Sequence, residues 1–383
     1  MVAIDSYAGG DGRLSPLSTP SATRAVLEAH GIGTKYTLGQ NFLVNDDVLK
    51  KIIALAEVGG NDRVLEVGPG IGTLTIALLK HAASVIAIER DPDLPAVLAD
   101  TLHPWREKFA LIEKDALDVT RDDIVSVAST MVEPGGDTGC PDRASSAANE
   151  TAQWAVSQSE DCLSESGYPV APPQEDLQLS LPSKLVANLP YAVAATVVLD
   201  YFENFPFLDS ATIMVQKEVA DRMAAAVGTK NYGAYTVKLG LYAEPVGRFA
   251  VGPGNFFPPP RVDSAVIRLN RRVPLMADGA PASPEVIAAA ALMADAAFTN
   301  RRKTIANSCK TYFSGRGPIL LGVADSSAAE GAPTIALPDG AATAERLPAI
   351  FEAAAIDPRR RGETLTQQEF LALGAALLKV TAA

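Results

Sequence analysis

The tetrapeptide Asn188-Leu189-Pro190-Tyr191 carries the side chains from which the chemistry of this chain can be inferred. It closes an apolar run at residues 184–187 that predicts a short buried strand. Pro190 must end that strand, because proline cannot donate the next ladder hydrogen bond. Asn188 Oδ1 and the Leu189 carbonyl could each accept an N–H from an amine on a heteroaromatic ring, and Tyr191 could stack on that ring. Two such acceptors would localise the nitrogen lone pair and so favour its attack on an electrophile. Taken alone, the tetrapeptide is also compatible with an ordinary strand-to-loop turn.

Three glycines, Gly68, Gly70 and Gly72, indicate where a ligand would lie beside that strand end. They follow a strand-like run at residues 63–67 and precede a helical run at 73–80. Glycine allows a tight turn and lets a ligand approach the backbone at a helix N-terminus. The spacing G-x-G-x-G differs from the G-x-G-x-x-G dinucleotide fingerprint, so the glycines alone do not identify a cofactor.

Two acidic residues follow the next two predicted strands. Glu89 ends the run at 84–88, about 20 residues past the glycines, where an acid typically binds a ribose hydroxyl pair. Asp115 ends the run at 110–114 and could accept from an exocyclic amine such as that of adenine. Each acid alone could be a solvated strand end, but together they favour a cofactor that contains adenosine.

Two further segments could close over such a site. Residues 34–43 form a polar and aromatic segment that is either a lid or a linker packed on the sheet. The proline-stiffened loop 255–260 could present Phe256 or Phe257 as a second aromatic face opposite Tyr191. Alternatively, both phenylalanines fill the core.

The composition is typical of a soluble globular protein with one large and one smaller domain. The chain has 383 residues, of which 48% are hydrophobic and 20% charged. It contains no apolar run of transmembrane length and no secretory leader, so we expect a cytoplasmic protein that does not bind a membrane. The three cysteines lack metal-binding spacing, and we expect no metal.

The net charge of −12 does not exclude a nucleic-acid substrate, because the negative charge is unevenly distributed. Residues 133–183 hold nine acidic side chains and one arginine, whereas residues 184–383 hold 18 acidic and 20 basic side chains. The basic residues of the second half occur partly in clusters, which could contact a polyanion such as RNA.

The pattern predicts an α/β fold with a small all-α C-terminal domain. We expect a disordered leader at 1–33, with a short amphipathic helix near its end, and a nucleotide-binding domain at 34–274. A disordered acidic insertion would occupy 133–182, because this tract is too poor in apolar residues to offset its ordering entropy. The C-terminal domain would span 275–383 and contain a low-complexity loop at 322–343.

Two triple-basic clusters in the C-terminal domain are candidates for RNA binding. They are Arg301-Arg302-Lys303 and Arg359-Arg360-Arg361. A cluster of charges can also be a solvated face, but two of them in an acidic chain favour contact with phosphates.

Several motifs occur together in one order and carry a resemblance to a known family. They are Leu38-Gly39-Gln40-Asn41-Phe42-Leu43, Glu66-Val67-Gly68-Pro69-Gly70-Ile71-Gly72, Asp115-Ala116-Leu117, Asn188-Leu189-Pro190-Tyr191, Phe256-Phe257-Pro258-Pro259-Pro260-Arg261-Val262-Asp263-Ser264-Ala265-Val266 and Arg301-Arg302-Lys303-Thr304. The chain resembles the bacterial KsgA/RsmA family of small-subunit rRNA dimethyladenosine transferases. The resemblance covers residues 34–269, apart from the insertion, and continues into the C-terminal helices.

The resemblance implies a Rossmann-like class I methyltransferase domain with S-adenosylmethionine as cofactor. It places Asn41 and Leu43 on the methionine side of the cofactor, Gly68 beneath it, Glu89 at the ribose, Asp115 at the adenine amine and Asn188 beside the reactive methyl group. By the same resemblance, Asn188 and the Leu189 carbonyl receive the target amine, and Tyr191 and Phe256 sandwich the target adenine.

The implied activity is N6,N6-dimethylation of two adjacent adenosines near the 3′ end of small-subunit rRNA. The partner would be an immature 30S particle, and we expect a monomer. One alternative is a large-subunit rRNA adenine methyltransferase of the macrolide-resistance type, and the C-terminal domain with its basic clusters argues against it. Another alternative is a non-catalytic assembly or RNA-binding factor. The presence of the site residues argues against a loss of catalysis; they are Glu66, Gly68, Glu89, Asp115 and Asn188. Lys114 and the insertion depart from the family pattern.

Overall fold

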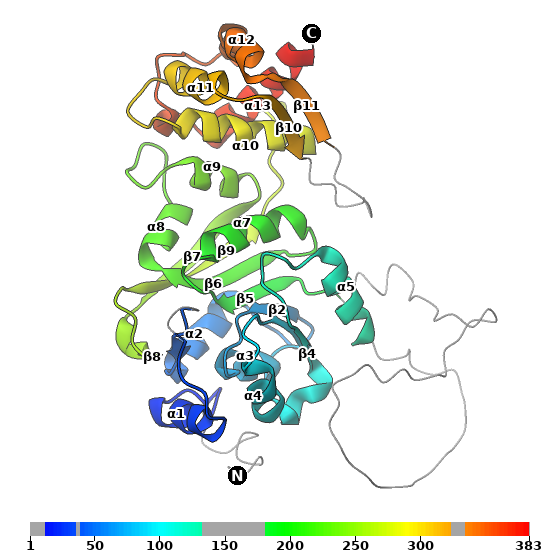
Figure 1. Ribbon diagram of the computed structural model, residues 1–383, viewed down its shortest axis with the longest axis vertical. Helices are drawn as coiled ribbons and strands as arrows, with labels where there is room; N and C mark the ends of the chain where they lie inside the picture. The colour runs from blue at the N-terminus through cyan, green and yellow to red at the C-terminus, as the bar shows by residue number, and fades with distance from the viewer. Residues whose placement is uncertain (1–11, 36–38, 132–180, 323–333, 383) are drawn as a thin grey trace, which may run out of the picture.

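The computed structural model describes residues 12–35, 39–131, 181–322 and 334–382. A seven-stranded sheet with the order β4-β3-β2-β5-β6-β9-β7 forms its centre (Figure 1). The strands of this sheet are β2 (Arg63–Val67), β3 (Ser84–Ile88), β4 (Phe109–Ile112), β5 (Lys184–Asn188), β6 (Ser210–Gln216), β7 (Ala243–Val251) and β9 (Ser264–Arg271). Strands β2 to β6 pair in parallel, whereas β9 is antiparallel to both β6 and β7. The predicted α/β fold is therefore confirmed.

Helices cover both faces of the sheet, which explains why its inner strands are apolar throughout. One face packs against α1 (Pro20–Ala29), α2 (Asp46–Ala56), α3 (Thr73–Leu79) and α4 (Leu94–Thr101). The other face packs against α5 (Arg121–Thr130), α7 (Ala194–Asn204), α8 (Lys217–Met223) and α9 (Ala234–Gly240). Shorter elements are β1 (Phe42–Leu43), β8 (Phe256–Phe257) and the 3₁₀ helices η3 (His103–Lys108), η4 (Pro253–Asn255) and η5 (Gly362–Thr364).

The C-terminal region is mainly helical but is not all-α as predicted. Its helices are α10 (Pro284–Phe298), α11 (Ile305–Ser314), α12 (Gly340–Ala353) and α13 (Gln367–Ala382). Two further strands, β10 (Pro318–Gly322) and β11 (Thr334–Asp339), form an antiparallel pair beside these helices.

The predicted low-complexity loop at 322–343 is therefore wrong for its second half, although residues 323–333 lie outside the described residues. Alternating apolar side chains allow residues 334–339 to form a strand whose Leu337 is buried. Asp339 then caps α12 by accepting a hydrogen bond from Ala342 N at 2.8 Å. The composition of this stretch concealed both the strand and the helix start.

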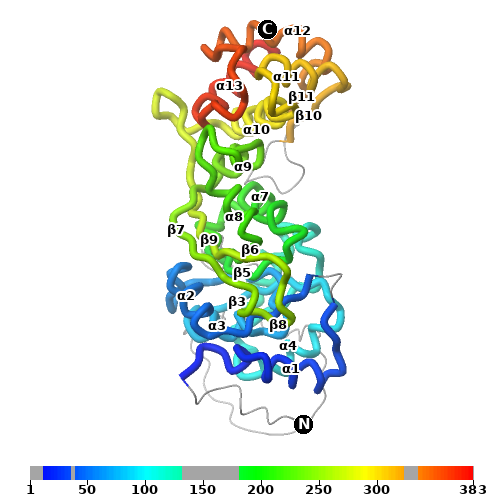
Figure 2. The backbone as a smooth tube through the Cα atoms, turned by 90° about the vertical axis from the view of Figure 1, so that its left-hand side faces the viewer, coloured from blue at the N-terminus to red at the C-terminus, as the bar shows by residue number. Residues whose placement is uncertain are grey.

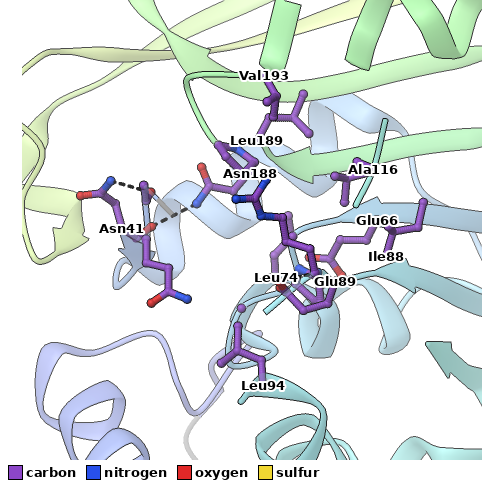
Figure 3. Close-up of a pocket in the computed structure, with 18 of the residues that line it drawn as sticks. Asn41, Glu66, Leu74, Ile88, Glu89, Leu94, Ala116, Asn188, Leu189 and Val193 are labelled. Carbon is purple, nitrogen blue, oxygen red and sulfur yellow. Dashed lines mark hydrogen bonds between the residues drawn. The ribbon is translucent and has the colours of Figure 1, made fainter. Parts of the chain in front are cut away.

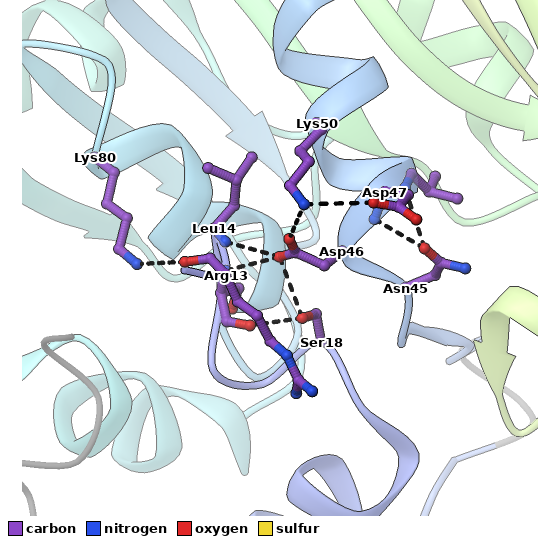
Figure 4. A network of polar contacts seen from close by, with 10 residues as sticks. Arg13, Leu14, Ser18, Asn45, Asp46, Asp47, Lys50 and Lys80 are labelled. Carbon is purple, nitrogen blue, oxygen red and sulfur yellow. Dashed lines mark hydrogen bonds and ion pairs between the residues drawn. The ribbon is translucent and has the colours of Figure 1, made fainter. Parts of the chain in front are cut away.

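The prediction of a disordered leader at 1–33 is wrong for residues 12–33, whereas residues 1–11 lie outside the described part. Asp46 at the start of α2 holds this segment, because its Oδ1 accepts from Leu14 N at 2.8 Å and from Ser18 Oγ at 3.3 Å (Figure 4). Leu17 is fully buried in the core beneath α2, and α1 follows with Thr19 as its N-cap. A few apolar anchors and one partly buried carboxylate thus order a segment of polar composition.

The acidic insertion predicted at 133–182 lies outside the described residues, except for two buried residues at its end, Leu181 and Pro182.

The C-terminal helices stack at one end of an elongated molecule, opposite the N-terminal segment (Figure 2). Three contacts join them to the loop between α8 and α9. Tyr232 Oη donates to Leu365 O at 2.8 Å, Gly228 N donates to Glu363 O at 2.8 Å, and an Arg301 side-chain nitrogen donates to Thr229 O at 2.9 Å. We refer to these three hydrogen bonds as the seam.

None of the helices that the structure describes has the length and apolar character that a bilayer crossing requires.

Candidate active site

A cavity of about 330 Å³ opens at the carboxyl ends of the parallel strands β2, β3 and β5 (Figure 3). This edge is where open α/β sheets bind ligands, because the loops after neighbouring strands diverge there. The cavity brings together most residues that the sequence singled out. These are Asn41, Leu43, Gly68, Glu89, Asp115, Asn188, Leu189 and Tyr191. Of the predicted lid, residues 39–43 line the cavity and residues 36–38 lie outside the described part.

Asn188 presents an oxygen to the cavity because its amide nitrogen is already engaged. It is the last residue of β5, and its Nδ2 donates to the Asn41 carbonyl at 3.2 Å (Figure 3). Since a carbonyl can only accept, the nitrogen must face Asn41, and Oδ1 is left to accept from a ligand. Leu189 N is bound to Met214 O at 3.1 Å, and no hydrogen bond found among the described residues ends on the Leu189 carbonyl. Two carbonyl-type acceptors are therefore available at the strand end.

Tyr191 lines the same end of the cavity with a partly exposed side chain. Its hydroxyl lies 2.6 Å from the hydroxyl of Ser264, which is fully buried on β9. Burial raises the pKa of Tyr191 above its ordinary value, and the hydrogen bond with Ser264 opposes part of this shift. The ring is therefore neutral at physiological pH and can offer its face to a base.

Phe256 does not line the cavity. It is 4% exposed and pairs with Leu43 across the short antiparallel ladder of β1 and β8. Its neighbour Phe257 is partly buried and lies under the guanidinium of Arg24, whose Cζ is 5.3 Å from the ring centroid. The core-filling alternative thus describes the observed position of Phe256, because strand pairing with β1 directs this side chain inward.

The glycine loop approaches the cavity in a conformation that a side chain would disturb. Gly68 has a φ of +70° and its N–H donates to Ile88 O at 2.9 Å. Gly70 has a φ of +61°, and a Cβ added there would lie 3.1 Å from the ring of Phe42. Glycine is needed at both positions so that the loop can turn beneath a ligand.

Glu89 stands at the end of β3, where an adenosine ribose would be expected. It is 8% exposed, and its Oε1 accepts from the backbone N–H groups of Arg90 and Asp91, both at 2.9 Å. Burial raises the pKa of Glu89 above its ordinary value, while these N–H groups stabilise its charged form. The backbone thus fixes the orientation of the carboxylate.

Glu66 is a cavity residue to which the sequence analysis assigned no role. It is 1% exposed, and burial raises its pKa to about 8, with the negative charge of Glu89 contributing. Its Oε2 and the Thr73 hydroxyl have no hydrogen-bond partner among the described residues. Buried polar atoms without partners are rare in proteins and indicate water or a ligand. The cavity floor therefore fits a ligand with polar groups, such as the amino-acid end of S-adenosylmethionine.

Asp115 is engaged on both oxygens in this structure. Its Oδ1 accepts from Leu117 N at 3.1 Å and its Oδ2 accepts from the guanidinium of Arg90 at 2.7 Å. Arg90 also lines the cavity, and the sequence did not predict it because an ion pair across 25 positions leaves no local pattern. Its side chain is 48% exposed, so the pair is weak enough to open when a ligand needs Asp115.

Some members of the two basic clusters form ion pairs, and the others have no ion-pair partner among the described residues. Arg301 binds Glu363 at 2.8 Å, Arg359 binds Asp357 at 3.1 Å, and Arg360 binds Glu369. Arg302, Lys303 and Arg361 are exposed, and no hydrogen bond or ion pair found among the described residues involves their side chains. These three residues lie in the loop before α11 and in the loop before η5.

Comparisons with known proteins agree with this geometry. The family profile "Ribosomal RNA adenine dimethylase" matches residues 33–332. The "Ribosomal RNA small subunit methyltransferase A" of Geobacillus sp. (strain WCH70) is 33% identical over 364 residues, which cover 95% of this chain and 98% of that protein. The protein of the same name from Staphylococcus epidermidis (strain ATCC 12228 / FDA PCI 1200) is 32% identical over 358 residues, which cover 93% and 94% of the two chains. A dimethyladenosine transferase structure from Plasmodium falciparum has a TM-score of 0.54 at 20% identity, covers 88% of this chain and 98% of that one, and supports the fold alone.

Proposed function

Because the chain belongs to the ribosomal RNA adenine dimethylase family, we propose that it methylates N6 of two adjacent adenosines near the 3′ end of small-subunit rRNA. The product would be two N6,N6-dimethyladenosines, formed during late biogenesis of the 30S subunit. The observation that supports this proposal best is the pair of acceptors, Asn188 Oδ1 and Leu189 O, at the exit of β5. They match the two N–H groups of an aromatic amine.

S-adenosylmethionine is the cofactor of this enzyme, and when bound it supplies an electrophilic methyl group on a positively charged sulfur. The residues that would hold it are Asn41 and Leu43 at the methionine end, Gly68 beneath it, Glu89 at the ribose and Asp115 at the adenine. Of these, Glu89 already has a fixed carboxylate. Asp115 would exchange the guanidinium of Arg90 for the adenine amine.

The protein's own contribution to the chemistry is to receive and polarise the target nitrogen. A base must leave its stack to reach a cavity at the sheet edge, and stacking on Tyr191 offsets part of a cost of a few kcal/mol. Asn188 Oδ1 and Leu189 O then accept the amine N–H groups and draw the nitrogen towards tetrahedral geometry. After methyl transfer the cationic nitrogen loses a proton to water, so no strong base is required. Asn188, a neutral acceptor, suits this sequence of steps.

The C-terminal region would contact the phosphates of the RNA through the exposed cations Arg302, Lys303 and Arg361. Arg301, Arg359 and Arg360 are paired with carboxylates and would shape this surface. The substrate would be an immature 30S particle in the cytoplasm. The enzyme would act as a monomer.

Two competing functions make different predictions. A large-subunit rRNA methyltransferase would use the same strand-end acceptors but would have no need of the C-terminal cations. A non-catalytic assembly factor would bind the particle without transferring label. Incubating the purified protein with labelled S-adenosylmethionine and, in separate reactions, with immature small subunits from a strain lacking the enzyme and with large-subunit rRNA, followed by nucleoside analysis, distinguishes these functions. We expect label in N6,N6-dimethyladenosine of small-subunit rRNA. Label in large-subunit rRNA only, or no label, would contradict the proposal.

A further inference from the structure

Ser264 contacts the side chain of Tyr191 from a distant part of the chain, and the site as described gives it no role. The two hydroxyl oxygens lie 2.6 Å apart although 73 positions separate the residues, and either hydroxyl can donate. Ser264 is fully buried. Among the described residues, Tyr191 Oη has no other hydrogen-bond partner.

The backbone of Ser264 is held by strand pairing on both sides. It begins β9, where it pairs with Gln216 of β6 on one side and with Val251 of β7 on the other. A serine side chain has a single rotatable bond to its hydroxyl, so a fixed backbone leaves the oxygen little freedom. Tyr191, by contrast, lies in the turn between β5 and α7. The sheet therefore supplies a fixed point to which the far end of the tyrosine ring is attached.

Attachment at this end fixes the position of the ring. A tyrosine held only at its backbone can swing about the Cα–Cβ bond, whereas one held also at Oη keeps the long axis of its ring in place. Stacking of a base on an aromatic ring requires the ring to lie at the right place beside the base. The hydroxyl pair is neutral, because burial raises the pKa of Tyr191. Its effect is thus on orientation and not on charge.

We propose that Ser264 is a positioning residue that holds the ring of Tyr191 at the position in which it stacks on the target adenine. This inference rests on the proposed function, in which Tyr191 touches the substrate and Ser264 acts only through Tyr191. It assigns the hydrogen bond an effect on the binding of the target base and no effect on the cofactor, whose adenosine would lie towards Glu89 and Asp115 at the other strand ends.

The test compares wild type with Ser264→Ala, Tyr191→Phe and the double variant. Tyr191→Phe keeps the ring and removes only the hydroxyl, so it isolates the hydrogen bond from stacking. We expect each single variant to lower kcat on immature 30S particles by about 3- to 10-fold, the range for one neutral hydrogen bond. The double variant should be no slower than either single one. KM for the particle and the Kd for S-adenosylmethionine, measured by calorimetry, should change by less than about twofold, since neither depends on this bond alone.

Ser210→Ala is the matched control, because Ser210 is also a buried serine at the start of a strand in the same sheet, and it makes no contact with Tyr191. It should leave kcat unchanged. Ser264→Ala and Tyr191→Phe activities equal to wild type would overturn the inference, as would effects that multiply in the double variant. A parallel loss of cofactor affinity would also overturn it, since that indicates a general structural role. If Ser264→Ala does not fold, Tyr191→Phe alone decides. An inactive wild type would overturn the proposed function and this inference together.

Discussion

Replacing Glu66 by glutamine should make the protein more stable, and the gain should grow with pH. Glu66 is buried and its pKa is raised to about 8 in the folded protein, against an ordinary value of 4.5. In the unfolded chain it ionises near the lower value. Between these two pH values the folded state binds a proton that the unfolded state does not bind. Stability therefore falls as pH rises through this window.

The magnitude follows from the width of the window. Each pH unit within it costs the wild-type protein about 1.4 kcal/mol of unfolding free energy, so going from about pH 5.5 to about pH 7.5 costs about 2.5 kcal/mol. Glutamine has nearly the same shape and does not titrate. Any cost of burying its amide is independent of pH and cancels when the two pH values are compared. Glu89 titrates in both proteins, so its contribution cancels to first order.

The measurement is urea unfolding of the cofactor-free protein at both pH values, followed by circular dichroism. Glu107→Gln, at an exposed position, is the control and should show no pH-dependent gain over wild type. A stability difference between Glu66→Gln and wild type that is the same at both pH values would refute the reasoning. It would show that Glu66 is charged in the folded state and has an unobserved partner.

Three further predictions concern the site and the RNA surface. Asn188→Ala should keep S-adenosylmethionine binding in calorimetry but lower methyl transfer at least about a hundredfold, the scale for one oriented transition-state acceptor; unchanged turnover would refute its role. Asp115→Ala should weaken cofactor binding by about 10-fold or more, whereas Arg90→Ala should change the Kd by less than about 5-fold because its exposed ion pair is weak; a larger effect of Arg90→Ala would show that the guanidinium itself binds the cofactor. Arg302→Ala should lower the affinity for the particle and reduce by about one the slope of the log binding constant against log salt concentration. Arg301→Ala should mainly lower thermal stability. The opposite pattern would contradict the proposed division of the cluster.

Local patterns in the sequence were sufficient to predict the strand end at Asn188 and the acid at Glu89. A proline that stops an apolar run, and an acid at the next strand's end, both act through backbone neighbours. The carboxyl ends of parallel strands meet at one edge, so these residues had to lie together once the α/β pattern was identified. The same holds for Asp115 and Gly68.

Long-range pairing could not be predicted in this way. Phe256 turns inward because β8 pairs with β1, more than 200 positions earlier in the chain, and no local period records that contact. Leu14 and Ser18 are held by Asp46, the first residue of α2. Arg90 reaches Asp115 through a long flexible side chain. In each case the deciding partner lies far along the chain.

The seam between the loop at 224–233 and the C-terminal helices has a consequence for how a target is chosen. Two of its three hydrogen bonds join backbone or buried groups, Gly228 to Glu363 and Tyr232 to Leu365, and Arg301 completes them. These bonds would hold the C-terminal region at a fixed distance from the cavity. Phosphates bound by the C-terminal region would then limit how far along the RNA the cavity can reach, so that adenosines would be selected by distance as much as by base identity.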